Sequence, residues 1–151
     1  MKPGVRTKAI VVGVAAGLAI AIFARMSTGS SSPPHISVVD AYGSESTSDA
    51  SALYVTLHNS GGGDHLVGAI TGAASSITIH GPDMVPKDRF AVGHGETGLV
   101  PGGSHIMLEG LPEPLRPGAQ IGVRLLFARS APIDLTVTVL SYDDVLAKVS
   151  S

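Results

Sequence analysis

The sequence predicts an all-β fold, an antiparallel β-sandwich, and three features lead to this prediction. The apolar residues gather in short runs, several of which alternate with polar residues at the period of a strand. Turn residues separate these runs about every eight to twelve positions, and the 151 residues include 19 Gly and 10 Pro. No segment beyond the N-terminus has a helical period of apolar residues. This pattern is typical of two packed antiparallel sheets.

Each predicted strand is a short apolar or alternating segment that ends at turn residues. In chain order these segments are 36–42, 53–57, 66–70, 77–80, 89–92, 97–100, 104–108, 120–128 and 133–142. The clearest alternation places Leu53, Val55 and Leu57 on one face of a strand. We therefore expect about seven to nine strands, of which 89–92 and 97–100 have the weakest pattern.

Two turns have residues with a specific expected task. Asn59 and Asp64 flank a Ser/Gly turn, and their side chains are expected to hydrogen-bond to the backbone of that turn. Gly102 and Gly103 precede the segment 104–108, where we expect them to supply positive φ values.

The N-terminal segment 1–26 differs from the rest of the chain. Its residues Ala9 to Ala24 are all apolar or Gly, and basic residues without any acid flank them. As a helix these 16 residues would span about 24 Å, short of the ~30 Å hydrocarbon core of a bilayer. The segment is therefore predicted to be an apolar helix, either a signal peptide or an uncleaved membrane anchor. The basic residues before it predict export, to the periplasmic or extracellular side of the cell envelope.

Composition divides the remaining chain into three parts. Residues 27–34 are rich in Ser, Gly and Pro and are expected to be a flexible linker. Residues 35–145 hold all the predicted strands and form the predicted folded domain, and residues 146–151 are a C-terminal tail.

Several classes of function are disfavoured by what the sequence lacks. It has no Cys, which excludes disulfides, iron–sulfur clusters, thiolate zinc sites, a cysteine nucleophile and a lipobox. The formal net charge of −2 argues against nucleic acid as a partner. A G-x-S-x-G elbow, an H-E-x-x-H motif and a Gly-rich loop that opens a helix are all absent. We therefore predict that the protein is not an enzyme.

Histidine and methionine form the one chemically suggestive pattern. His105 and Met107 are two apart in a predicted strand, so their side chains project from one face. His80 ends another predicted strand, and a Gly-Pro-Asp turn could bring Met84 back beside its imidazole. Thioether and imidazole ligands together suit Cu(I), because both are neutral and the thioether needs no deprotonation. A structural role for these residues is the alternative, since a Met in a strand usually fills the core.

The residues 101–111, PGGSHIMLEGL, resemble the signature of the periplasmic copper chaperone family called PCuAC. A Pro/Leu-rich turn and a Gly follow at 114–118, as in that family, and the upstream segment 52–59 is also similar. The resemblance covers about residues 36 to 140. It implies a cupredoxin-like Greek-key β-sandwich that binds copper.

By this resemblance the copper ligands are His80, Met84, His105 and Met107. The sequence departs from the family in one respect: only three residues separate His80 from Met84, a much shortened loop. Whether Met84 reaches the metal, or His94 replaces or joins it, is left open by the sequence.

The other histidines are expected to lie outside the site. His58 and His65 adjoin the turn residues and are predicted to be on the surface. His35 lies at the edge of the domain, where a solvated position is the simpler expectation, although such a residue could help to hold Cu(II).

The resemblance thus implies an extracytoplasmic copper chaperone that holds Cu(I), with Cu(II) as an open second possibility. It would pass the ion to a copper-accepting protein, such as a respiratory oxidase subunit or an assembly factor, and an uncleaved N-terminus would attach it to the membrane. The alternative is a secreted or tethered β-sandwich interaction module without a metal site.

Overall fold

The computed structural model describes residues 32–151, in which ten strands and one helix are found. The predicted helix of segment 1–26 and most of the linker lie outside these residues. In chain order the elements are β1 (Ile36–Ser44), β2 (Ala50–Asn59), β3 (Asp64–Thr71), β4 (Ser76–His80), β5 (Pro86–Lys87), β6 (Phe90–Val92), β7 (Gly95–Leu99), β8 (His105–Glu109), β9 (Gln120–Phe127), β10 (Ile133–Leu140) and α2 (Tyr142–Val149). No helix within residues 32–151 has the length and apolar character that a membrane span requires.

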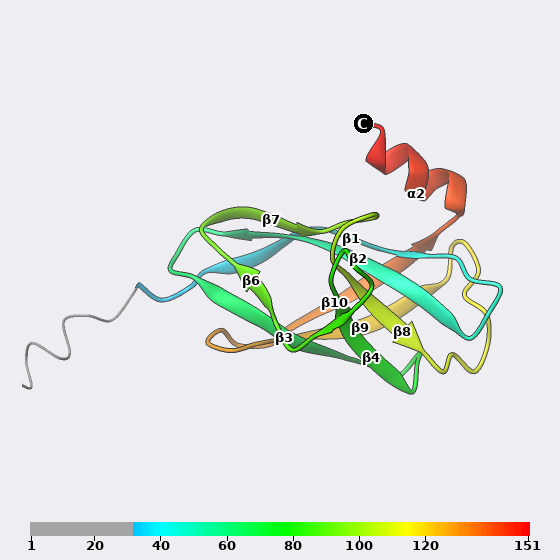
Figure 1. The fold of residues 1–151 in the computed structure, drawn as a ribbon, viewed down its shortest axis with the longest axis horizontal. Helices are drawn as coiled ribbons and strands as arrows, with labels where there is room; N and C mark the ends of the chain where they lie inside the picture. The colour runs from blue at the N-terminus through cyan, green and yellow to red at the C-terminus, as the bar shows by residue number, and fades with distance from the viewer. Residues whose placement is uncertain (1–31) are drawn as a thin grey trace, which may run out of the picture. The chain divides into compact units, whose positions relative to one another are not determined.

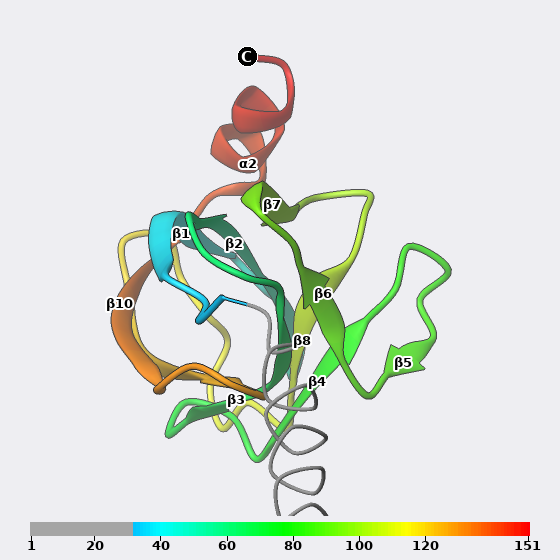
Figure 2. The same ribbon diagram turned by 90° about the vertical axis from the view of Figure 1, so that its left-hand side faces the viewer.

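The strands form one continuous sheet that bends around a common interior. Its order is β5-β4-β8-β2-β1-β10-β9-β3-β6, and β7 pairs with β2 off this path (Figure 1). The long strand β2 has room for two neighbours on one edge, since β8 pairs with residues 50–53 and β7 with residues 55–59. Figure 2 shows the strands curving around the interior, with α2 outside them. The all-β prediction is confirmed for the described residues.

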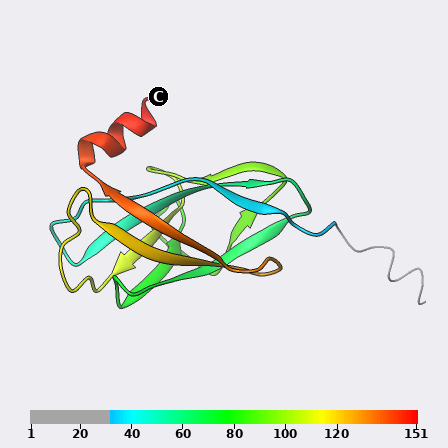
Figure 3. The same ribbon diagram turned by 180° about the vertical axis from the view of Figure 1, so that it is seen from behind.

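One strand pair differs from the predicted antiparallel arrangement. The strands β1 and β10 pair in parallel at their ends, with Tyr42 opposite Thr138 and Ser44 opposite Leu140. Figure 3 shows β10 (orange) leading into α2 (red). The other strand pairs within residues 32–151 are antiparallel. The parallel pair joins the first and last strands, and parallel neighbours require a long connection. Alternation within each segment predicts its faces but not its neighbour, so the sequence did not reveal this pair.

The core lies where the alternation places it. Leu53, Val55 and Leu57 are only 0%, 2% and 0% exposed. Apolar residues from seven other strands and from the loop between β8 and β9 complete the same cluster: Leu66, Ala69, Ile79, Val92, Leu99, Ile106, Leu108, Leu111, Leu115, Ile121, Val123, Leu125, Phe127, Val137 and Val139. Where one face of a strand is committed to this core, the opposite face is free to present polar and metal-binding side chains.

The C-terminal helix α2 corrects the sequence analysis, which extended a strand to residue 142 and treated 146–151 as a tail. Ser141 caps the helix, since its Oγ accepts a hydrogen bond from the Asp144 N–H. Acidic residues occupy the first turn and Lys148 the last, which suits the helix dipole. With only eight residues and one buried side chain, Val145, the helix shows too short an apolar period to be recognised.

The turn after β2 is organised by Asn59, as predicted. Its Oδ1 accepts hydrogen bonds from the N–H groups of Gly61 and His35, both at 3.0 Å, and its Nδ2 donates to the Gly62 carbonyl at 2.8 Å. The fully buried amide therefore holds the turn and the start of the domain together.

Asp64 has a wider role than its predicted local turn. Besides the N–H of His65, its carboxylate accepts hydrogen bonds from the N–H groups of Arg129 and Ser130 and from the Ser130 hydroxyl. Burial raises the pKa of Asp64, but these hydrogen bonds, led by the Ser130 hydroxyl, outweigh it and leave the pKa below its ordinary value. The ionised carboxylate thus joins the start of β3 to the turn between β9 and β10.

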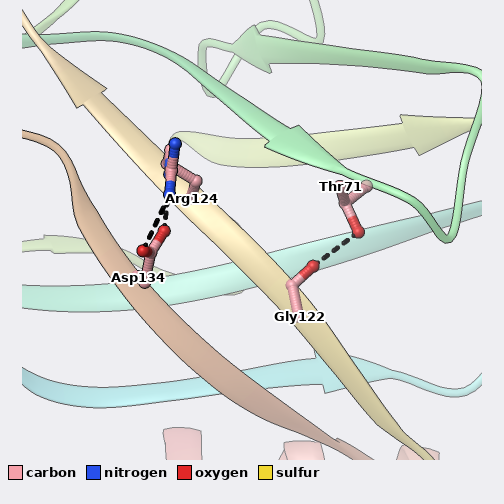
Figure 4. A network of polar contacts seen from close by, with 4 residues as sticks. All are labelled: Thr71, Gly122, Arg124 and Asp134. Atoms are coloured by element: carbon pink, nitrogen blue, oxygen red, sulfur yellow. Dashed lines mark hydrogen bonds and ion pairs between the residues drawn. The ribbon is translucent and has the colours of Figure 1, made fainter.

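Polar contacts also join β3, β9 and β10 on their outer face, as Figure 4 shows. Thr71 Oγ1 donates to the Gly122 carbonyl at 2.7 Å. Arg124 makes a two-pronged ion pair with Asp134, at 2.6 Å from Nε and 3.0 Å from Nη2. These contacts lie on strands that do not carry the His/Met pattern.

Candidate metal centre

Two histidines from neighbouring strands lie side by side. The strands β4 and β8 pair so that His80 stands directly opposite His105. Their ring centroids are 5.5 Å apart, and the ring planes meet at 61°. The register of β4 against β8 thus brings together two histidines that are far apart in the sequence.

His105 is held in a defined tautomer. Its Nδ1 lies 3.1 Å from the Gly103 carbonyl oxygen, and only 7% of the residue is exposed. Because a carbonyl oxygen can only accept a hydrogen bond, Nδ1 carries the proton and Nε2 keeps its lone pair. A histidine oriented in this way is prepared to bind a metal ion through Nε2.

His80 has an unusual ring nitrogen. Its Nδ1 is the only buried side-chain nitrogen or oxygen atom in residues 32–151 that lacks a hydrogen-bond partner. The opposite nitrogen, Nε2, lies 3.2 Å from Thr78 Oγ1. A buried polar atom without a partner costs free energy, so its presence calls for an explanation, and a role as a metal ligand is one.

Both methionines of the pattern line a hollow together with His105. This hollow has a volume of about 320 Å³ and is open on one side. Met107 follows His105 by two residues on β8 and is half-buried. Met84 reaches the hollow from the turn between β4 and β5 and is 60% exposed. The structure therefore places His105, Met107 and Met84 around one hollow, and His80 against the ring of His105.

The short loop between His80 and Met84 closes as a tight turn. The Met84 N–H donates to the Gly81 carbonyl at 3.0 Å, and the Gly81 N–H donates to the Val85 carbonyl at 2.9 Å. Met84 has a φ of 62°, the only positive φ of a non-glycine residue among residues 32–151. Such a conformation is strained for a Met and is often associated with a functional position. The turn leads the chain into β5 on the edge of β4 opposite β8, and the Met84 side chain on it still lines the hollow together with His105 and Met107.

The turn before β8 also sets the position of His105. Gly102 has the predicted positive φ, 79°. Gly103 does not, so the second half of that prediction is wrong; instead a Cβ there would lie 3.1 Å from a Val100 methyl group. Gly103 therefore packs closely against the exposed side chain of Val100 and has an ordinary φ.

The sequence analysis did not identify the tyrosines beside the hollow. Tyr54 and Tyr142 line it, and Tyr42 lies against Tyr54 with ring centroids 5.3 Å apart. All three tyrosines of the chain thus lie on this face. Burial, then the neighbouring Tyr42 and Tyr142, raise the pKa of Tyr54, so its hydroxyl is neutral. The alternation in β2 does turn Tyr54 away from the core, but the sequence could not show that β8 is its neighbour.

The remaining histidines lie elsewhere. His94 Nδ1 is 3.3 Å from the Gly61 carbonyl, beside the Asn59 end of β2, whereas β8 pairs with the Ala50 end. His58 is exposed and stands opposite Glu96. In residues 32–151, no three His, Asp or Glu side chains are grouped so that they could hold a metal ion. Beside His105, the hollow is lined by Met84 and Met107, whose thioethers can serve as soft metal ligands.

Comparison with known proteins agrees with this architecture. A family model described as "Putative lipoprotein LpqE-like" matches residues 34–139 and ends before α2. A protein of Leifsonia xyli subsp. xyli, named "Putative lipoprotein Lxx21020", is 33% identical over 144 residues, which is 89% of this chain and 86% of the relative.

Solved structures that resemble the chain include PCuAC domains. The "Copper-bound PCuAC domain from PmoF2" is 19% identical, with a TM-score of 0.64 over 70% of this chain and 92% of that domain. The "Solution structure of CuI-DR1885 from Deinococcus Radiodurans" is 25% identical, with a TM-score of 0.54 over 73% of this chain and 78% of that one. The resemblance to the PCuAC family is thereby confirmed, and the chain belongs to the LpqE-like family, a lipoprotein family of the PCuAC type.

Proposed function

We propose that the protein is an extracytoplasmic copper chaperone that binds Cu(I) through His80, Met84, His105 and Met107. One observation carries this proposal: the two imidazoles lie 5.5 Å apart, and His80 Nδ1 is buried without a partner. The two thioethers beside the same hollow would complete a set of four ligands. The similar structures named as copper-bound or CuI-loaded support copper as the cargo.

The chemistry of this ligand set favours Cu(I). Two imidazoles and two thioethers are neutral, so the site would keep the single positive charge of the ion. Cu(I) is a soft ion that accepts thioether sulfur, whereas Cu(II) prefers nitrogen and oxygen in a tetragonal arrangement. Of the residues that line the hollow, only Glu45 has a charged side chain, and its Oε1 accepts the Tyr142 N–H.

Delivery would begin at Met84. Its side chain is the most exposed of the four, and it lies on a turn rather than on a paired strand. An incoming ligand from an acceptor could displace this thioether first, while His105 and Met107 on β8 still hold the ion. The proposed acceptor is the copper centre of a respiratory oxidase subunit or an assembly factor that serves it. No catalytic turnover is involved.

We further propose that segment 1–26 directs export, as a cleaved signal or a retained anchor. Membership of a lipoprotein family supports a location in the cell envelope. Because the sequence contains no Cys, a lipid could not be attached in the usual lipoprotein manner. In the retained form, the apolar segment would serve as the membrane anchor.

A Cu(I) competition titration against a chromophoric chelator tests the proposal. The full chain in a mild detergent should bind one equivalent tightly, and His105→Ala should abolish this binding. His58→Ala is the matched control, since His58 is exposed and distant from the hollow. If wild type and His105→Ala bind Cu(I) equally weakly, the chaperone proposal fails and the interaction module becomes the better account.

A further inference from the structure

Thr78 is a neighbour of the proposed ligands that has no assigned role. It lies two residues before His80 on β4, so the two side chains project from the same face. Across the strand pair, Thr78 stands opposite Met107 just as His80 stands opposite His105. Its Oγ1 is 3.2 Å from His80 Nε2, a hydrogen-bond distance.

This hydrogen bond can run in either direction, and the two directions have different consequences. If the Thr78 hydroxyl donated to Nε2, the proton of the neutral ring would sit on Nδ1, which is buried and has no acceptor. If Nε2–H donates to the Thr78 oxygen, Nδ1 keeps a bare lone pair. In proteins, a buried N–H group without an acceptor is rarer and costs more free energy than a buried lone pair without a donor. The second direction is therefore favoured even before any metal binds.

We propose that Thr78 is a positioning residue of the site: its hydroxyl oxygen accepts the Nε2–H of His80 and leaves the Nδ1 lone pair available to the metal. The two histidines then bind through different nitrogens, His80 through Nδ1 and His105 through Nε2. The backbone carbonyl of Gly103 has the same effect on the other histidine: it accepts the Nδ1–H of His105 and leaves the Nε2 lone pair of that ring available. The identity of the metal in this inference rests on the proposed function. The tautomer of His80 does not, because it follows from the hydrogen bond to Thr78 alone.

Two substitutions separate the hydroxyl from the shape of the side chain. Thr78→Ser keeps the oxygen, whereas Thr78→Val keeps the branched shape, which suits a strand, but removes the acceptor. Thr71→Val is the matched control, because it also removes a hydroxyl that hydrogen-bonds from a strand, here to the Gly122 carbonyl, on a part of the sheet without the His/Met pattern (Figure 4).

The first readout needs no metal. We would label histidine with ¹⁵N in the full chain, kept in detergent at pH 8, above the range in which histidines ordinarily titrate. In wild type and Thr78→Ser, His80 should show a proton on Nε2 that exchanges slowly with water. Thr78→Val should lose that protected proton, while Thr71→Val should retain it. A wild-type His80 with its proton on Nδ1 would overturn the proposal.

The second readout is the Cu(I) affinity of the same four proteins. Loss of a partner that orients a ligand histidine typically weakens metal binding about 10- to 100-fold. We expect a loss of that size in Thr78→Val and no comparable loss in Thr78→Ser or Thr71→Val. Equal affinity of Thr78→Val and wild type would overturn the positioning role. Failure of wild type to bind Cu(I) would instead refute the proposed function, and the tautomer measurement would still decide the role of Thr78.

Discussion

At the scale of single residues, Met107 combines two tasks that a substitution can separate. It is half-buried on β8, so it packs as well as facing the hollow. Met107→Leu nearly conserves volume and should lower the free energy of unfolding by less than ~1.5 kcal/mol. Because only the thioether sulfur is a soft ligand, the same change should weaken Cu(I) binding more than Cu(II) binding. Denaturation curves and paired Cu(I) and Cu(II) titrations would check this; equal weakening of both ions would argue that Met107 serves only packing.

At Met84, a substitution should weaken Cu(I) binding without lowering the stability of the fold. Its φ of 62° is unfavourable for any residue with a Cβ and unstrained for glycine. Since the side chain is exposed, Met84→Gly should leave the free energy of unfolding unchanged or raise it by up to about 1 kcal/mol. The same variant should bind Cu(I) more weakly, because a thioether is gone. Chemical denaturation combined with the chelator titration measures both effects. A clear loss of stability without any change in affinity would mean that Met84 is a packing residue.

At the scale of the elements, α2 is held to the sheet by few contacts. Lys148 forms an ion pair with Asp40 at 2.6 Å and lies 4.7 Å from the centre of the Tyr42 ring. Glu45 accepts the first N–H of the helix, and Val145 is its only buried residue. Because Tyr142 also lines the hollow, the attachment of α2 affects one wall of the proposed site.

The cap of α2 provides a direct test of this attachment. Ser141→Ala removes the side-chain acceptor for the Asp144 N–H and should destabilise the helix by about 1 kcal/mol. Amide hydrogen exchange should accelerate in α2 while the β2 and β8 amides remain protected. Ser151→Ala is a suitable control, because its hydroxyl bonds only to the Lys148 carbonyl at the end of the chain. Uniformly faster exchange in sheet and helix would contradict the view that α2 is a separately held element.

The sequence allowed nine of the ten strands in residues 32–151 to be predicted, because buried apolar residues mark them; β5, whose two residues are both exposed, was missed. Alternation located β2, β9 and β10 within a few residues, and turn residues bounded the others. It could not predict that β1 pairs with β10, since pairing depends on contacts between distant segments. The helix α2 was missed because its single buried residue leaves no apolar period to detect.

The site was predictable to a similar extent. The His-x-Met spacing on β8 depends only on the two-residue period of a strand. The meeting of His80 with His105 depends on the register of β4 against β8, which no local pattern contains. Tyr54 and Thr78 were not identified for the same reason. Tyr54 lines the hollow only because of how β2 pairs with its neighbours, and Thr78 acts only through the tautomer of His80.

At the scale of the whole domain, Asp64 links segments that lie far apart in the chain. Its folded-state pKa is lowered, so its stabilising effect is complete above the ordinary aspartate pKa of about 4 and is lost as the pH falls below it. Asp64→Asn should therefore lower the free energy of unfolding by about 2 kcal/mol at pH 7, in line with hydrogen bonds to a charged group. The difference from wild type should shrink at pH 3, because the carboxyl of the unfolded chain has gained its proton there, which lowers the advantage of the folded, ionised form.

Urea denaturation at the two pH values would measure this difference. Asp134→Asn is the control: Asp134 is paired with Arg124 on the exposed face, so its substitution should have a much smaller effect at pH 7 (Figure 4). A stability gap for Asp64→Asn that stays constant from pH 7 to pH 3 would contradict the role given to its charge.

X-ray absorption at the copper edge tests the central claim most directly, because it identifies the atoms bound to the ion. The Cu(I)-loaded full chain should show two nitrogen and two sulfur neighbours, from the four residues that the fold gathers, and Met84→Gly should lose one sulfur. Spectra of wild type that contain only nitrogen and oxygen neighbours would contradict the claim that the two imidazoles and two thioethers form one site.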